Sequence, residues 1–198
     1  LLEDQILFES LRKRGLVVTR KSWSDKNFDW SNTNFAIIRS TWDYFDKIDE
    51  FSQWLTNVKD KLVLINSFNL IKWNLNKSYL LDFSKKKINI ASSIFINSKN
   101  FTTLKKLFNQ TNWDEAIIKP AISGAAKNTF RVNKENCDDF ESIFRKLCDK
   151  ETMIFQIFLK SIISFGEISL MVFGGEYSHS VRKIAKEGDF RVQDDHGG

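Results

Sequence analysis

One stretch decides how this chain is interpreted: Ile117-Ile118-Lys119-Pro120-Ala121-Ile122-Ser123-Gly124-Ala125-Ala126-Lys127-Asn128-Thr129. An apolar run ends at Lys119, the only proline follows, and small residues lead to a second lysine and two side chains that donate hydrogen bonds. This pattern suits a polyphosphate, because lysine supplies a point charge and small side chains let backbone N–H groups approach the oxygens. Taken alone, a strand followed by an ordinary turn with solvated lysines explains it better, so the rest of the chain has to decide.

The composition indicates a globular protein with one large domain or two small ones, since 198 residues are 42% hydrophobic and 28% charged. No apolar run is long enough to span a bilayer, and no secretory signal is visible. The chain begins at Leu1 and ends at Gly197-Gly198, which favours an excerpt with sequence missing at both ends. A net charge of +5 is compatible with a nucleic-acid or membrane partner, but the lysines are scattered, which favours a solvated surface.

The cysteines favour a reducing, cytoplasmic compartment. Cys137 and Cys148 are expected on one helix, where a separation of eleven residues at about 1.5 Å each is far too long for a disulfide. The same spacing returns to nearly the same helix face, so both cysteines are expected in the core. Free cysteines that form no disulfide fit a reducing compartment. His179 and His196 have no partner at zinc-ligand spacing, and no metal-ligating residue is assigned.

The first part of the chain alternates between helical and strand patterns. Such alternation with apolar strands predicts a parallel sheet covered by helices, whose first strand is expected to precede Leu1. Helices are expected over 3–14 and 46–60, with Gly15 ending the first, and short buried strands over 16–18, 35–38 and 62–65.

The polar segment Arg39-Ser40-Thr41-Trp42-Asp43-Tyr44 follows the expected strand at 35–38. Ligands of open α/β sheets bind beyond the carboxyl ends of the strands, which makes this segment a candidate binding loop. A polar loop that caps the following helix explains the same residues, and both interpretations stay open.

A different region begins near Lys72. Seven of the chain's eight glycines lie in it, all of them after residue 123. Phe140, Ile143, Phe144 and Leu147 form a helical stripe that indicates core packing. Helices are expected over 78–86, 102–110 (capped by Thr102 or Thr103) and 135–148, strands over 93–96, 115–119, 130–132, 153–159, 167–173 and 176–186, and a hairpin turn at Gly174-Gly175.

Several common catalytic patterns are absent from the sequence. It contains no Gly-x-x-x-x-Gly-Lys-Ser/Thr loop, no Gly-x-Gly-x-x-Gly fingerprint, no serine elbow and no cysteine with a convincing histidine partner. An enzyme with this sequence is therefore expected to use positioning and charge rather than a covalent nucleophile.

The remaining motifs occur in the order found in ATP-grasp enzymes, and the sequence resembles that superfamily. It looks closest to the glutathione-synthetase-like branch, which includes the ribosomal-protein glutamate ligases and the O-ureido-D-serine cyclo-ligase group. The segments 186–191 and 196–198 resemble the glycine-and-arginine loop of the glutamate ligases, whereas 39–44, Trp73-Asn74 with Lys77, and 174–183 resemble the cyclo-ligase group.

The resemblance implies an α/β fold with an α+β lid. An N-terminal parallel α/β domain over 1–75 would precede the ATP-grasp nucleotide-binding lid over 76–158 and the start of the ATP-grasp core domain over 159–198.

The resemblance also implies how a nucleotide is held at its phosphate end. Lys77 and Lys119 match the two lysines that hold the ATP phosphates. Ser123, Gly124 and Thr129 match the flexible loop that closes over the phosphates.

The adenosine end is implied to bind further along the chain. Gln156, Ile157 and Leu159 match the hinge whose backbone meets the adenine edge, and Glu167 matches the acid that accepts from the ribose hydroxyls. The first hinge position is often Glu in the superfamily and is Gln156 here, a change expected to matter little because backbone groups read the adenine.

Arg182 and Arg191 match arginines that contact the acyl phosphate or the carboxylate substrate. The implied activity is that of an ATP-dependent carboxylate–amine ligase, a cytoplasmic enzyme that forms a carbon–nitrogen bond through an acyl phosphate. ATP and Mg²⁺ are the implied cofactors, with the metal ligands expected beyond residue 198. A small amino-acid-like substrate is implied and no nucleic-acid or membrane partner. Because members of the family are often oligomeric, the resemblance leaves a homo-oligomer open, although nothing in the sequence marks an interface.

Three alternatives stay open. An ATP-grasp enzyme with another acceptor would form an ester, a thioester or a ring. A non-catalytic ATP-binding domain would serve as a scaffold. A basic, aromatic-rich nucleic-acid binder would show steeply salt-dependent binding to DNA or RNA.

Overall fold

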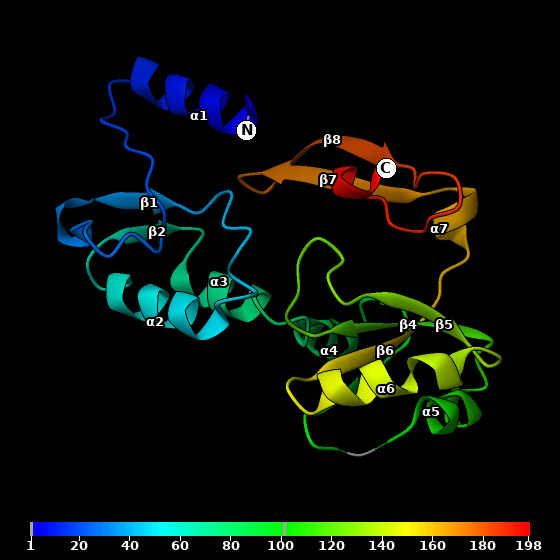
Figure 1. Cartoon of the computed structure of the whole chain (residues 1–198). Helices are drawn as coiled ribbons and strands as arrows, with labels where there is room; N and C mark the ends of the chain where they lie inside the picture. The colour runs from blue at the N-terminus through cyan, green and yellow to red at the C-terminus, as the bar shows by residue number, and fades with distance from the viewer. Residues whose placement is uncertain (1, 101) are drawn as a thin grey trace. The chain divides into compact units, whose positions relative to one another are not determined.

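The computed structural model (Figure 1) describes residues 2–100 and 102–198. The chain forms two compact units, unit 1 over Leu1–Leu75 and unit 2 over Asn76–Gly198. Among the described residues, no helix is both long enough and apolar enough to cross a membrane.

Unit 1 is a small parallel α/β structure, as the alternating pattern predicts. Strands β1 (Phe35–Ile37) and β2 (Val63–Ile65) pair in parallel, with Ala36 opposite Leu64. The helices are α1 (Leu2–Lys13), α2 (Ile48–Val58) and α3 (Phe68–Asn74), with a short 3₁₀ helix at Trp30–Asn32. The core consists of Trp23, Phe51, Leu55, Val58, Leu62 and Leu64.

Two expectations for unit 1 are wrong. The apolar triplet at 16–18 is not a strand, and Val17 is fully exposed, because β-branched residues form a strand only where a neighbouring strand accepts their hydrogen bonds. Helix α3 was not expected, although Ser67 caps it by accepting from the Leu70 N–H at 3.4 Å. Phe68 and Ile71 pack against the core at helical spacing, which is the signal that identifies this helix.

The sheet of unit 1 is covered less completely than expected. Leu62 and Leu64 are 7% exposed, whereas Val63 and Ile65 are 55% and 46% exposed. Because successive side chains of a strand point to opposite faces, the described residues bury only one face of this sheet.

Unit 2 contains an antiparallel sheet with strand order β3-β6-β4-β5, which places β6 in its interior. The strands are β3 (Ser93–Ile96), β4 (Glu115–Pro120), β5 (Phe130–Asn133) and β6 (Met153–Ile157), and the helices are α4 (Tyr79–Lys85), α5 (Leu104–Thr111) and α6 (Cys137–Cys148). These elements confirm the expected ones, with ends that agree within two residues. The largest differences are that β6 ends two residues before the expected 159, and that α5 and α6 begin two residues after the expected 102 and 135.

The two faces of this sheet differ in chemistry. Ala116 and Ile118 of β4 are fully buried against α5 and α6, together with Val132, Met153 and Phe155 of the neighbouring strands. Figure 1 shows both helices lying along this face. The residues that alternate with them in β4, Ile117 and Lys119, therefore point to the opposite face.

Both cysteines lie on α6, and both are free and buried, as their spacing predicts. Burial raises the pKa of each thiol, that of Cys148 to about 11. The helical stripe is also confirmed as core at Phe144 and Leu147, whereas Ile143 lies at its edge and is 36% exposed.

The chain continues through a short helix α7 (Ser161–Ser164) into the hairpin of β7 (Glu167–Phe173) and β8 (Glu176–Lys183). Gly174 and Gly175 form the turn with φ of +59° and +89°, values that favour glycine and confirm the hairpin signal. Strand β8 is shorter than expected, and most residues of both strands are exposed. A 3₁₀ helix, Asp194–His196, follows near the end.

We expect Thr103→Ala to destabilise unit 2 by about 1 kcal/mol, since removing a threonine cap typically has this effect. The Thr103 hydroxyl accepts from the Lys106 N–H at 3.1 Å at the start of α5. Equilibrium urea unfolding measures the change, with Thr102→Ala as the matched control. Equal destabilisation by both substitutions would contradict the assignment of the cap to Thr103.

Candidate functional site

The candidate site lies on the face of the four-stranded sheet that points away from α5 and α6. Gln156 of β6 lies between Ser93 of β3 and Ile117 of β4. Since cross-strand neighbours share a face, and so do residues two apart in one strand, Ser93, Gln156 and Lys119 all lie on this side.

Lys119 is largely enclosed by the protein. Its Nζ donates to Gln156 Oε1 at 2.8 Å, and burial lowers the pKa of its ammonium group. Gln156 is neutral, so this hydrogen bond orients Lys119 without cancelling its charge. A partly desolvated cation without a paired carboxylate attracts an anion more strongly than a solvated one does.

Lys77 joins the same site from the segment before α4. Its N–H donates to Ala121 O at 2.8 Å, and its Nζ donates to Ser123 O at 2.7 Å. Burial and the nearby charge of Lys119 lower the pKa of Lys77 to about 8, while the carboxylate of Glu151 acts in the opposite direction. The two lysines therefore act on one another, and bringing an anion between them would relieve their repulsion.

The loop that follows β4 is bonded mainly to itself. Ser123 Oγ donates to Lys127 O at 2.9 Å, the Lys127 N–H donates to Gly124 O at 2.9 Å, and the Thr129 N–H donates to Ala126 O at 3.1 Å. Ala125, Ala126 and Asn128 have φ between +47° and +54°, a conformation that L-residues adopt at a cost in free energy.

Part of the backbone of the predicted hinge is already hydrogen-bonded to neighbouring segments of the chain. The Ile157 N–H donates to Ser92 O at 2.9 Å, and the Phe158 N–H donates to Glu115 O at 3.1 Å. Leu159 follows the end of β6 and is 52% exposed, while its carbonyl accepts from the Ile162 N–H at 3.0 Å. The side chain of Gln156 is engaged as well, which the sequence analysis did not anticipate.

Three other predicted residues are held by local partners. Glu167 Oε1 lies 3.7 Å from Lys183 Nζ, and the guanidinium of Arg182 lies 5.4 Å from the centre of the Phe165 ring. Arg191 donates to Asp189 through Nε and Nη2, and these hydrogen bonds hold the pKa of Asp189 well below its usual range. These hydrogen bonds occupy Nε and Nη2, so Asp189 fixes the orientation of the Arg191 guanidinium.

Sequence reasoning did not identify Ser93 or Glu151 as members of the site. Gln156 Nε2 donates to Ser93 Oγ at 2.8 Å, and Glu151 acts on Lys77 through its charge. Only the pairing of β3 with β6, which are distant in sequence, brings Ser93 to Gln156. Periodicity within a segment carries no signal for such a contact.

The implied Mg²⁺ is not matched by these residues. Mg²⁺ prefers oxygen ligands in octahedral geometry. Within residues 2–100 and 102–198, no group of three or more His, Cys, Asp or Glu side chains could hold a metal ion. The described residues therefore offer no set of ligands that fits the ion.

The segment Arg39–Tyr44 in unit 1 is tied down by that unit's own side chains. The buried Asp4 of α1 accepts from Arg39 Nε at 3.0 Å and from the Ser40 hydroxyl, and these bonds lower the pKa of Asp4. Asp43 accepts from Trp23 Nε1 at 2.8 Å. These contacts support a structural role for the segment, whereas the exposed Trp42 remains open to a ligand.

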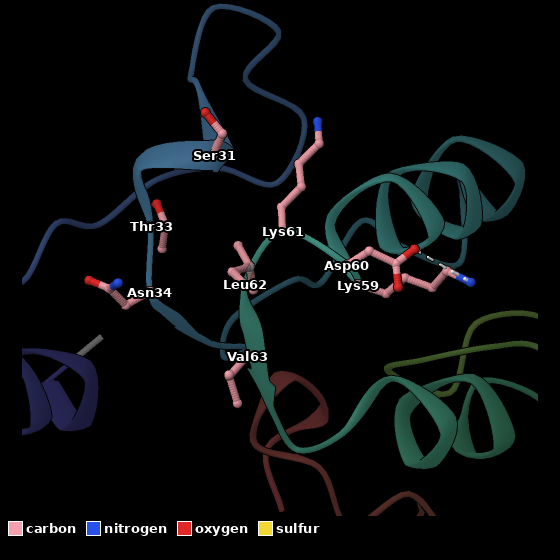
Figure 2. A pocket seen from close by; sticks show the side chains of 8 residues that line it. All are labelled: Ser31, Thr33, Asn34, Lys59, Asp60, Lys61, Leu62 and Val63. Carbon is pink, nitrogen blue, oxygen red and sulfur yellow. Dashed lines mark ion pairs between the residues drawn. The ribbon is translucent and has the colours of Figure 1, made fainter.

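A pocket in unit 1 is lined by none of the predicted site residues (Figure 2). It is formed where Asn34 precedes β1 and Leu62 precedes β2, that is, at the amino ends of the parallel strands. Lys59 and Asp60, 3.9 Å apart, pair beside it. Because parallel sheets bind ligands beyond their carboxyl ends, and no predicted site residue lines this pocket, we do not place the site there.

We expect ATP to bind more weakly as the pH rises from 7 to 9. The pKa of Lys77 is lowered to about 8, so the free protein loses this charge over that range. Binding of an anion then requires proton uptake, and the affinity falls by up to about tenfold per pH unit above the pKa. Calorimetry in buffers of different ionisation heat measures the affinity and the proton uptake, with Lys77→Met as the comparison. Equal affinity at pH 7 and 9 would contradict a lowered pKa.

Comparisons with known proteins cover nearly the whole chain. Residues 76–198 match the family model described as prokaryotic glutathione synthetase, ATP-grasp domain, and residues 2–66 match that of the D-cycloserine synthetase DcsG N-terminal domain. The chain is 25% identical over 183 residues to the cycloserine biosynthesis protein DcsG of Streptomyces lavendulae, covering 90% of this chain and 61% of that protein.

Solved structures share the fold. The crystal structure of D-cycloserine synthetase DcsG is similar with a TM-score of 0.82 and 23% identity, over 90% of this chain and 61% of that one. The ATP-grasp ligase PsnB, complexed with a minimal precursor, is similar with a TM-score of 0.56 and 15% identity, over 96% of this chain and 70% of that one. These similarities confirm the expected ATP-grasp fold.

Proposed function

This chain belongs to the prokaryotic glutathione synthetase ATP-grasp domain family, matched over residues 76–198, and from that premise we propose that it acts as an ATP-dependent carboxylate–amine ligase. The observation that carries the proposal is the pair Lys77 and Lys119. Both ammonium groups have a pKa lowered by burial, and Lys119 acts electrostatically on Lys77. Two partly desolvated cations at the end of a strand suit the phosphates of a nucleotide.

The proposed reaction has two steps. A carboxylate oxygen attacks the γ-phosphorus of ATP, the bond to the β-phosphate oxygen breaks, and ADP leaves with an acyl phosphate formed. An amine nitrogen then attacks the acyl carbon, the bond from that carbon to the phosphate oxygen breaks, and phosphate leaves. The amine loses a proton as the amide forms. Catalysis of this kind depends on positioning and on stabilising negative charge.

The residues have separate roles in this proposal. Lys77 and Lys119 hold the phosphates, and the loop residues Ser123, Gly124 and Thr129 close over them and exclude water. Backbone groups of the hinge meet the adenine, and the exposure of Leu159 supports that role.

The remaining predicted residues act at the other end of the nucleotide and on the substrate. Gln156 and Ile157 begin the hinge, and Glu167 accepts from the ribose hydroxyls. Arg182 and Arg191 bind the acyl phosphate or the substrate carboxylate, for which a planar guanidinium is well suited. ATP requires Mg²⁺ in this chemistry, where the metal supplies charge neutralisation of the phosphates.

The domain division follows from the same proposal. The four-stranded sheet of residues 76–158 forms the nucleotide-binding lid, and the hairpin that begins after α7 belongs to the core domain over 159–198. The isolated pairing of β7 with β8, separate from the four-stranded sheet, supports this division.

The substrate is proposed to be a small amino-acid-like molecule. The match of residues 2–66 to the N-terminal domain of a D-cycloserine synthetase supports this choice. The chain spans 61% of the length of that curated relative, so the experiment requires the full-length protein.

The test incubates the full-length protein with Mg·ATP, a panel of small amino acids and hydroxylamine. A carboxylate substrate should give ADP and a hydroxamate, because hydroxylamine captures an acyl phosphate. ATP binding without ADP release for any carboxylate would contradict the proposal and favour a non-catalytic ATP-binding domain. Steeply salt-dependent binding to DNA or RNA would favour a nucleic-acid binder instead.

A further inference from the structure

Three side chains from three adjacent strands form one connected chain of hydrogen bonds. Lys119 Nζ on β4 donates to Gln156 Oε1 on β6 at 2.8 Å, and Gln156 Nε2 donates to Ser93 Oγ on β3 at 2.8 Å. Ser93 Oγ donates in turn to Ala91 O at 2.7 Å, just before β3 begins. Strand β6 lies between β3 and β4 in the sheet, so Gln156 links the other two strands.

The chemistry of the groups leaves a single direction for this chain. An ammonium group only donates, so the Gln156 oxygen must face Lys119 and the Gln156 nitrogen must face Ser93. The Ser93 hydroxyl accepts from that nitrogen, and its one proton goes to the backbone carbonyl of Ala91. Hydrogen bonds that point in one direction polarise and strengthen one another.

The same arrangement decides how much charge Lys119 keeps. Gln156 uses one of the three donors of the ammonium group and leaves two for a ligand. A carboxylate in the place of the amide would pair with Lys119 and compete with an incoming phosphate, so the residue type at position 156 matters through Lys119, contrary to the expectation based on adenine contacts alone. The amide fixes the position of the ammonium group without neutralising it.

We infer that Gln156 and Ser93 are positioning residues that hold the Lys119 ammonium group in place for a nucleotide phosphate. This inference rests on the proposed nucleotide site and adds to it a role for the Gln156 side chain and for Ser93. It assigns the strand β3 to the site, although β3 carries none of the residues implied to contact the nucleotide.

The first arm of the test measures ATP affinity in the full-length protein with Mg²⁺ present. Ser93→Ala should weaken ATP binding about 3- to 10-fold, the equivalent of one lost hydrogen bond. Ser92→Ala is the matched control, because its exposed side chain lies beside Ser93 and has no part in the chain of bonds. Unchanged affinity in Ser93→Ala, with an unchanged melting temperature, would overturn the inference.

The second arm follows the pH dependence of acetylation at Lys119, measured by mass spectrometry after brief exposure to acetic anhydride. Gln156→Glu should move half-maximal labelling to higher pH, because a carboxylate stabilises the charged ammonium, and should weaken ATP binding. An unchanged labelling profile would overturn the inference, since a merely structural glutamine would leave this profile in place.

The two arms also separate this inference from the proposed function. If the natural protein binds no ATP, the proposed function fails, whereas the labelling profile still reports whether Gln156 controls Lys119. If ATP binds normally to both variants, the nucleotide site stands and the positioning role fails. Should Gln156→Glu not fold, Ser93→Ala tests the role alone through ATP affinity.

Discussion

Lys119→Met is expected to weaken ATP binding about 10- to 100-fold while unit 2 stays folded. A buried hydrogen bond to a charged group contributes about 1.5–3 kcal/mol, and each 1.4 kcal/mol corresponds to tenfold in affinity. Stability should be unchanged or greater, because burial disfavours the charged form of Lys119 and methionine has no charge to desolvate.

Thermal denaturation of the full-length protein with and without Mg·ATP measures the loss. At about one hundred times the dissociation constant, ATP stabilises the natural protein by roughly 2.7 kcal/mol, and the variant should show most of that shift only at far higher concentration. Lys106→Met is the matched control, since Lys106 is exposed on α5, on the opposite side of the sheet. A variant that melts without ligand would point to a structural lysine instead.

Phe155→Ala should have the largest effect on stability, a loss of about 3–5 kcal/mol, as is typical for a fully buried phenylalanine. The ring is completely buried. It packs edge-on against Phe108, with 5.1 Å between the ring centres, and it stacks on Trp113, with 5.4 Å between the ring centres. Its removal leaves a cavity that β6, an interior strand, cannot close by moving.

Urea unfolding at equilibrium measures this loss. Phe173→Ala serves as the control, because Phe173 is 67% exposed and its truncation should change the free energy of unfolding by less than about 0.5 kcal/mol. Comparable losses of unfolding free energy in both variants would contradict the prediction that the buried Phe155 contributes more to stability than the exposed Phe173. Because Phe155 precedes Gln156, the variant should also weaken ATP binding through the strand that carries the positioning side chain.

The elements that sequence predicted best are those whose signals are local. The Thr103 cap, the Gly174-Gly175 turn and the amphipathic α6 each depend on residues within a few positions of one another. The strand predicted over 16–18 is wrong for the opposite reason. Its apolar residues would need hydrogen bonds from a neighbouring strand, and a local pattern does not reveal whether that strand is present.

The same distinction applies to the candidate site. Lys77, Lys119 and the loop after β4 are predicted from motif order; in the structure Lys77 Nζ donates to Ser123 O of that loop, and the charge of Lys119 acts on Lys77. The tie from Gln156 to Ser93 depends on strand pairing across 63 positions, which no local pattern encodes. The roles of all the predicted site residues stay predictions, and Glu167, Arg182 and Arg191 each have a local partner in this structure.

The two buried thiols of α6 allow local unfolding of unit 2 to be measured by thiol labelling. Both cysteines of the chain lie in this unit, so a thiol reagent labels only unit 2. A buried thiol with a raised pKa reacts only when the protein around it opens, and the labelling rate relative to that of a free thiol then gives the free energy of that opening. Added nucleotide should slow the labelling wherever opening of α6 also disrupts the lysine site.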